Sequence, residues 1–142
     1  NATRLHGFLP DGKINPKPVL VNGSLAPDTC SPVIVGDRVF ATAYGEMYCL
    51  DLKNGLKTIW VMEDDMFFDH SNVIGGNGRV LAWTNSGDLL LLDATANEFK
   101  PLSRLRPFGD ASADSMSHPA IVGNRLYLRG PNELACFELG GN

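Results

Sequence analysis

Residues 31–60 read SPVIVGDRVFATAYGEMYCLDLKNGLKTIW, in which four short apolar runs alternate with turn residues. Gly36-Asp37 lies between the first and second runs, Tyr44-Gly45 between the second and third, and Asn54-Gly55 between the third and fourth. Short connections that contain glycine are typical of β-hairpins, because glycine readily adopts positive φ. The stretch therefore predicts an antiparallel meander of four strands.

This pattern returns twice further along the chain. The run at residues 38–41 is matched at 79–82 and at 125–128, so the repeat recurs after about 40 residues. Each copy continues with a turn residue, an acid, an apolar run and a second acid. Repeats of this length with four strands each are typical of β-propeller blades rather than of sandwiches or barrels. The predicted fold class is all-β, with about three four-stranded antiparallel blades.

The repeats divide the chain into four parts. Residues 1–30 are expected to form a loop with an extra hairpin, turned at Asn22-Gly23, or the end of a preceding blade. We expect the first blade over 31–60, a connection and the second blade over 61–99, and a long loop and the third blade over 100–142.

Propellers close with ~4–8 blades, whereas an arc of three exposes the flat faces of its end blades. We therefore expect the chain to be a fragment of a larger propeller of about seven or eight blades, or to assemble from several copies. The expected partners are the remaining blades, from the same parent chain or from other copies, and other proteins. The isolated chain is expected to self-associate or to be unstable.

Composition excludes some function classes and gives no metal motif. The formal net charge is −4, whereas nucleic-acid binding needs a concentrated basic face. No apolar run approaches the ~18 residues of a membrane span. The cysteines lack the ligand spacing of metal sites. Because Cys49 and Cys136 occupy one repeat position, we expect that position to be buried and apolar.

Two connections between the repeats are rich in charge. Residues 61–70, VMEDDMFFDH, contain four acids, but a calcium loop would need alternating oxygens and a glycine at its bend. A solvated connection with a few residues under the next blade is favoured over a cation site. Long loops on rigid scaffolds often carry binding residues, and residues 100–116 form the longest connection. Arg104, Arg106, Asp110 and Asp114 are interspersed among its small residues.

One basic position recurs directly after the first hairpin turn of every repeat. It is held by Arg38, Arg79 and Arg125. In a propeller these guanidinium groups would share one rim, where they could bind an anion. A charge that keeps the hairpin soluble is the favoured alternative. Trp83 is the candidate for an exposed stacking residue on this rim, with packing as the equal alternative.

The repeats resemble the pyrroloquinoline-quinone-like (PQQ-like) β-propeller repeat, and the chain looks like the C-terminal segment of such a propeller. The resemblance covers residues 31–139 and rests on Ser31-Pro32, Gly36-Asp37-Arg38-Val39, Leu50-Asp51, Asn54-Gly55 and Trp60. In this family an aspartate, a glycine turn and a tryptophan dock adjacent blades. The resemblance therefore implies a blade-docking role for Asp51, Asn54, Gly55 and Trp60, with Asp93 and Glu138 as the corresponding acids. Two departures are that Trp60 lies one residue further from Gly55 than is usual and that the second repeat lacks the tryptophan.

The family includes quinoprotein dehydrogenases and the outer-membrane barrel-assembly lipoprotein. Its enzymes use a pair of adjacent cysteines, a calcium ion and a catalytic aspartate, but this chain has no adjacent cysteine pair. We expect a non-catalytic scaffold that binds proteins or ligands, with no catalytic residue, metal or cofactor in this chain. The alternative is the C-terminal part of a PQQ-dependent dehydrogenase whose PQQ, calcium and catalytic residues lie outside it. The resemblance implies a bacterial protein that is periplasmic or secreted.

Overall fold

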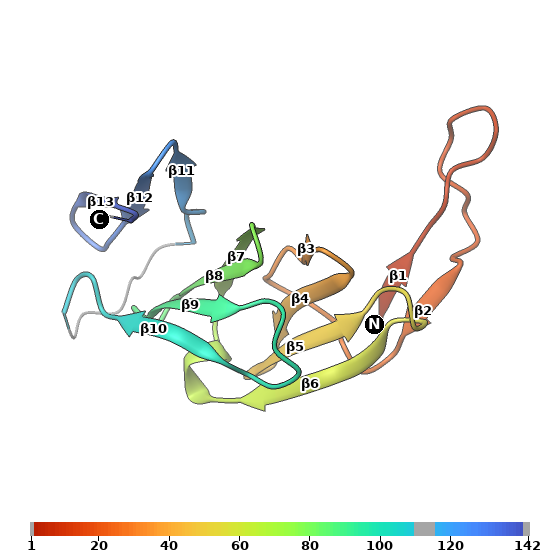
Figure 1. Cartoon of the computed structure of the whole chain (residues 1–142), viewed down its shortest axis with the longest axis horizontal. Coiled ribbons are helices and arrows are strands. Elements are labelled where there is room, and N and C mark those ends of the chain that lie inside the picture. Colours follow the sequence, from red (N-terminus) through yellow and green to blue (C-terminus); the bar gives the residue numbers. More distant parts are fainter. Residues whose placement is uncertain (1, 110–115, 141–142) are drawn as a thin grey trace.

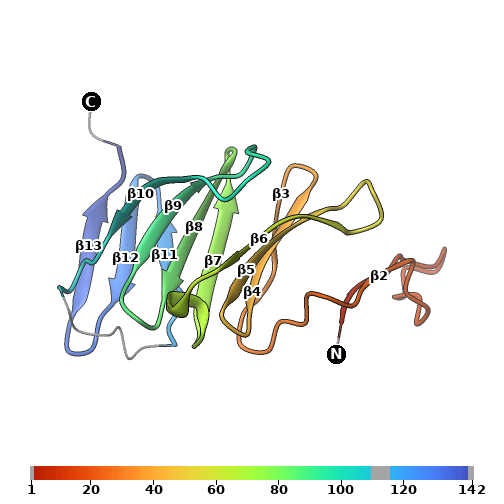
Figure 2. The ribbon, with the colours of Figure 1, turned by 90° about the horizontal axis from the view of Figure 1, so that it is seen from below.

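The computed structural model describes residues 2–109 and 116–140, and within them the regular structure is β-strand apart from one short 3-10 turn. The strands form four antiparallel sheets, which lie beside one another in an arc (Figures 1 and 2). The all-β class predicted from the repeats is confirmed. The elements are β1 (Thr3–Leu5), β2 (Leu20–Asn22), β3 (Val33–Val35), β4 (Arg38–Ala43), β5 (Glu46–Asp51), β6 (Lys57–Glu63), η1 (Asp65–Phe67), β7 (Ser71–Gly76), β8 (Arg79–Thr84), β9 (Leu89–Asp93), β10 (Pro101–Leu105), β11 (Ala120–Val122), β12 (Arg125–Arg129) and β13 (Leu134–Glu138).

The first blade is the four-stranded meander β3-β4-β5-β6. Its fourth strand continues to Glu63, so residues 61–63, which were predicted to belong to the following connection, are part of this blade. Val35 pairs with Arg38, so Gly36 and Asp37 form a two-residue turn with Gly36 at φ 60°. Tyr44 and Gly45 join β4 to β5 with φ of 52° and 86°, as in a type I′ turn. Because successive turns of a meander alternate between its ends, the β3–β4 and β4–β5 turns lie on opposite rims of the blade.

The second blade, β7-β8-β9-β10, contains a strand that we had assigned to a connection. Pro101–Leu105 pairs with β9 as the fourth strand, so the prediction of a loop was wrong for these residues. Arg104 therefore belongs to a strand. Asp110 and Asp114 lie outside the described residues.

The third sheet has three strands in its described part, β11-β12-β13, rather than the four expected. Residues 1–30 contain an extra hairpin, formed by β1 and β2, but its turn is not at Asn22-Gly23, because β2 ends there and pairs with β1. The Asn22 side chain accepts the backbone N–H groups of Ser24 and Leu25, each at 2.9 Å, and donates to the Leu56 carbonyl at 2.7 Å. Asn22 thereby attaches the β1–β2 hairpin to the first blade.

Each blade contributes one face of its sheet to the next junction. In the first blade this face carries Phe40 and Cys49, both fully buried. The matching residues of the third sheet are Tyr127 and Cys136, and Cys136 is exposed. The prediction of a buried side chain was therefore right for Cys49 and wrong for Cys136, because the described residues place no further sheet against β13.

Candidate functional site

Asp51 organises the turn that leads from β5 to β6. Its Oδ1 accepts the backbone N–H groups of Lys53 and Asn54, each at 3.0 Å. The chain then passes through Gly55 and Leu56, at φ 71° and 60°, before β6 begins. Glycine accommodates positive φ without a steric penalty, whereas Leu56 adopts it with its side chain buried.

Trp60 lies at the contact between the first and second blades. Its ring is 8% exposed and lies 6.0 Å from Phe40 and 5.7 Å from Phe99, a residue of the second blade. A register shift in β6 lets Trp60 pair with Cys49 while Thr58 pairs with Leu50, which leaves Ile59 as the extra residue. This bulge accounts for the additional residue between Gly55 and Trp60.

Arg38 also connects the first two blades. Its Nη1 donates to the Ala96 carbonyl and its Nη2 donates to Asn97 Oδ1 at 2.7 Å. Ala96 and Asn97 belong to the connection between β9 and β10. The guanidinium group that we considered for anion binding is therefore engaged with backbone and amide oxygens of the neighbouring blade. A polar groove of about 410 Å³ at this junction is lined by Asp37, Arg38, Asp51, Lys53, Ile59 and Asn97.

The equivalent arginines are arranged differently. Arg79 donates to its neighbouring carbonyl, that of Gly78, at 3.1 Å and stays exposed, and Arg125 is exposed as well. The structure places the three arginines at matching points of their sheets. Arg38 differs from the other two in the contact that it makes with the next blade.

We expect Arg38→Ala to lower the free energy of unfolding by about 1 kcal/mol, because it removes a charge-assisted contact between blades at a partly exposed site. Arg79→Ala is the matched control at the same repeat position and should change stability by less than about 0.5 kcal/mol. Urea denaturation of both variants measures the difference. Equal losses would show that the contacts of Arg38 to Ala96 and Asn97 contribute nothing.

Asp93 repeats the turn-forming arrangement of Asp51 in the second blade. Its Oδ1 accepts the Thr95 backbone N–H at 3.0 Å and the Thr95 hydroxyl at 2.7 Å, and its Oδ2 lies 3.2 Å from Lys100 Nζ. These contacts, chiefly those with Thr95, lower the pKa of Asp93 to about 2. In the third sheet, Glu138 accepts from Asn124 Nδ2 at 2.9 Å.

The lowered pKa of Asp93 predicts a stability change in acid. The stabilising contribution of the carboxylate is present above its ordinary pKa of 3.8 and is lost as the pH falls from there through about 2. Asp93→Asn should therefore melt at a lower temperature than the wild type at neutral pH, with a difference that shrinks towards about pH 2. Thermal unfolding followed by circular dichroism across this range tests it. A difference that is independent of pH would contradict a contribution from the charge.

Trp83 is not available for stacking in this structure. It is 1% exposed and lies 6.0 Å from Phe108, at an interplanar angle of 63°. Phe108 in turn covers Gly130, where an added Cβ would lie 2.8 Å from the Phe108 ring. Trp83 therefore packs between the second and third blades, which is the alternative to an exposed stacking role.

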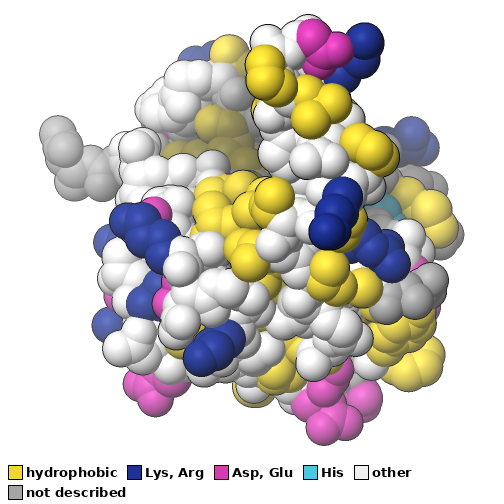
Figure 3. Space-filling view, turned by 90° about the vertical axis from the view of Figure 1, so that its right-hand side faces the viewer, with side chains coloured by type: hydrophobic (Ala, Val, Ile, Leu, Met, Phe, Trp, Pro, Cys, Tyr) yellow, Lys and Arg dark blue, Asp and Glu magenta, His cyan; other side chains and the backbone are white. Residues whose placement is uncertain are grey.

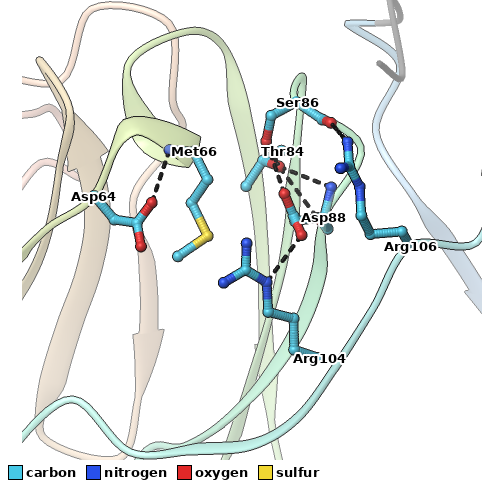
Figure 4. A network of polar contacts seen from close by, with 7 residues as sticks. All are labelled: Asp64, Met66, Thr84, Ser86, Asp88, Arg104 and Arg106. Atoms are coloured by element: carbon cyan, nitrogen blue, oxygen red, sulfur yellow. Dashed lines mark hydrogen bonds and ion pairs between the residues drawn. The ribbon is translucent and has the colours of Figure 1, made fainter. Parts of the chain in front are cut away.

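A polar network lies on the rim formed by η1, the β4–β5 turn and the β8–β9 turn, which we call the η1 rim (Figure 4). Asp88 is 3% exposed, and its carboxylate accepts from Arg104 Nε at 2.9 Å and from the Ser86 hydroxyl at 3.1 Å. The hydrogen bond to Asp88 raises the pKa of Arg104. Arg106 donates to the Ser86 carbonyl at 2.6 Å.

This network holds the β8–β9 turn against β10. Sequence reasoning placed Arg104 and Arg106 in a loop and did not pair them with Asp88. The sequence shows an acid at the start of each apolar run as a repeated feature. It does not show that Asp88 is buried. Asp88 is paired with the guanidinium group of Arg104. The network therefore stabilises the fold of the rim.

The acidic connection after β6 is folded closely onto the first blade. Asp64 caps η1 by accepting the Met66 N–H at 3.0 Å, and Met66 and Phe67 are buried. Among residues 2–109 and 116–140, no group of three or more His, Cys, Asp or Glu side chains is arranged to hold a metal ion. Within the same residues, no helix is long and apolar enough to cross a membrane.

Solved structures show what the chain is similar to. The crystal structure of BamB from Moraxella catarrhalis aligns with a TM-score of 0.61 and 22% identity, over 76% of this chain and 32% of that chain. The fold is that of β-propeller blades. The chain spans about a third of the length of BamB, and at this identity the likeness concerns the fold alone.

A second solved structure is less similar. Hsv2 from Kluyveromyces lactis aligns with a TM-score of 0.46 and 11% identity, over 73% of this chain and 30% of that chain. No family model matches the chain, and no curated protein sequence matches it.

Proposed function

We propose that this chain is a non-catalytic part of a larger PQQ-like β-propeller, in a bacterial periplasmic or secreted protein, that serves as a protein-binding scaffold. The observation that carries the proposal is the contrast between inner and outer junctions of the arc. Val35, which faces the second blade, is 9% exposed, whereas the equivalent Val122 is 65% exposed. Cys49 and Cys136 show the same contrast.

The other end of the arc is apolar as well. Exposed hydrophobic side chains gather on the flank that carries the β1–β2 hairpin (Figure 3), among them Val19, Val21 and Ile34, each more than half exposed. A shallow groove of about 160 Å³ lies between this hairpin and the first blade. Apolar surfaces of this kind are energetically favourable to cover, so both flanks support association with further blades or other proteins.

Thiol labelling tests whether the flank of β13 is covered. In the natural protein that contains this chain, Cys136 should react with maleimide at least about tenfold more slowly than it does after unfolding in urea. Cys49 is the internal reference for a protected thiol, since burial raises its pKa to about 11. Labelling of native Cys136 at the unfolded rate would contradict the placement of another blade or a partner on this flank.

A second experiment separates the scaffold from the alternative of a quinoprotein dehydrogenase. The natural protein, carrying a photoactivatable phenylalanine analogue at Leu134 or at Val21 on the two flanks, should form cross-links to protein segments in the cell. The purified protein, supplied with PQQ and calcium, should not reduce a dye in the presence of alcohols. Alcohol-dependent dye reduction would favour the dehydrogenase, and the absence of protein cross-links from either flank would contradict the scaffold.

A further inference from the structure

The tyrosine at the β4–β5 turn is unusual for its position. Tyr44 adopts φ 52° and is followed by Gly45 at φ 86°. The first position of such a turn favours asparagine, aspartate or glycine, because a bulky side chain at positive φ crowds the backbone. Tyr44 is nevertheless 61% exposed, so burial does not offset this cost. Neither the turn nor the core accounts for an aromatic side chain here.

A second exposed aromatic residue lies beside this turn. η1 buries Met66 and Phe67, whereas the next residue, Phe68, is 74% exposed. A Cβ added to Gly45 would lie 3.4 Å from Phe68 Cδ2, and Gly45 N–H donates to the Phe67 carbonyl at 3.3 Å. The Asp64 N–H donates to the Gly45 carbonyl at 3.0 Å. Hydrogen-bonded backbone thus holds both exposed aromatic residues on one part of the η1 rim.

The charged residues in the two segments that carry these aromatic residues, 44–46 and 63–69, are all acidic. Glu46 stands directly opposite Glu63 in the β5–β6 register, and like charges in this arrangement are destabilising. Glu46 accepts a hydrogen bond from the Tyr48 hydroxyl, and Arg104 lies near Asp64 but is paired with Asp88. In the described part of the chain, the ion pairs include none to Glu63, Asp65 or Asp69. The two segments that carry the rings therefore bear negative charge and contain no lysine or arginine of their own.

We propose that Tyr44, Phe68, Glu46, Glu63 and Asp65 form a docking surface for a partner protein segment in which lysine or arginine residues flank an apolar residue. Exposed, rigidly held aromatic side chains are typical centres of protein interfaces. Their faces bind both apolar groups and cations, while the carboxylates attract basic side chains. The proposal deepens the scaffold function proposed above and names the chemistry of the partner.

Peptide binding to the natural protein tests the surface. The probes are a fluorescent peptide that alternates leucine with arginine and lysine, and a counterpart in which every basic residue is glutamate. We expect anisotropy to detect binding of the basic peptide alone, with an affinity that falls as salt is added. Failure of the basic peptide to bind, or equal binding of the acidic one, would overturn the proposal.

Two variants of the rim and one control variant separate binding from folding. Tyr44→Asn should weaken binding of the basic peptide at least about fivefold while the melting temperature is unchanged or raised, because Asn-Gly suits this turn. Phe68→Ser should weaken it similarly, whereas Phe8→Ser should not, although Phe8 is 77% exposed and Phe68 is 74% exposed. Unchanged binding in Tyr44→Asn, or an equal loss in Phe8→Ser, would overturn the assignment to this rim.

The test also distinguishes a second copy of the chain as the occupant. If sedimentation shows self-association that Phe68→Ser abolishes and the basic peptide does not displace, the surface is a self-interface and the proposed partner is wrong. The scaffold function is tested independently by cross-linking from the flanks at Leu134 and Val21. Flank cross-links without peptide binding would reject the docking surface and retain the scaffold.

Discussion

Replacing Trp60 with alanine is expected to lower the free energy of unfolding by about 3–5 kcal/mol, as is usual for removal of a large core aromatic residue. The indole is 8% exposed and packs between Phe40 of its own blade and Phe99 of the next. Its removal would leave a cavity at the blade junction in addition to the lost burial. Equilibrium denaturation in urea, with tryptophan-independent detection by circular dichroism, measures the loss.

Two control variants show whether the loss comes from the junction. Trp60→Phe keeps an aromatic ring against Phe40 and Phe99 and should cost less than about half as much as Trp60→Ala. Phe68→Ala removes an aromatic side chain that is 74% exposed and should change stability by less than about 0.5 kcal/mol. If Trp60→Ala were as mild as Phe68→Ala, Trp60 would not join the blades.

Gly75→Ala is expected to destabilise the same junction by about 1–3 kcal/mol through overpacking. An added Cβ at Gly75 would lie 2.3 Å from Val35 Cγ2 and 2.9 Å from Val33 Cγ2, both on β3 of the preceding blade. Valine side chains on a paired strand have few alternative rotamers, so relief would require the two sheets to move apart. Thermal and urea unfolding of the variant measure the effect.

The neighbouring glycine provides a control of opposite sign. No heavy atom lies within 4 Å of a Cβ added to Gly76, so Gly76→Ala should be neutral or stabilising by up to about 1 kcal/mol. Val35→Ala should relieve the clash, so the double variant with Gly75→Ala should lose less than the two single losses combined. Additive losses, or the same sign at Gly75 and Gly76, would show that the close contact with β3 does not limit this position.

The repeat itself predicted the sheets because its signals are local. Gly36-Asp37 and Asn54-Gly55 are turn sequences whose backbone requirements can be stated from the residues alone, and the observed φ values at Gly36 and Gly55 are positive. Asp51 lies where its carboxylate can reach the N–H groups of the next turn, a contact between residues two and three positions apart. Such short-range interactions do not depend on the neighbouring blade.

The errors arose where distant residues compete for a position. Asn22-Gly23 has the sequence of a hairpin turn, yet the Asn22 side chain bonds to Leu56 and β2 pairs with β1 instead. Residues 101–105 have weak strand signals, and they become a strand because β9 presents an unpaired edge. In the described part of the chain, the conformation of these two segments depends on pairing with a distant strand and not on the local sequence pattern.

The sequence by itself determined the blade period and the turns within residues 31–60, because glycine placement and alternating apolar runs act within a few residues. The tertiary structure alone decided which side chains became parts of a junction or of a surface. Arg38 bonds to the second blade because that blade packs beside the first. Trp83 is buried because the third sheet packs beside the second blade. Phe68 lies beside the turn that carries Tyr44 because β6 and η1 return the chain to the β4–β5 turn. Which sheet face meets which neighbour depends on how whole blades stack, and no local pattern contains that information.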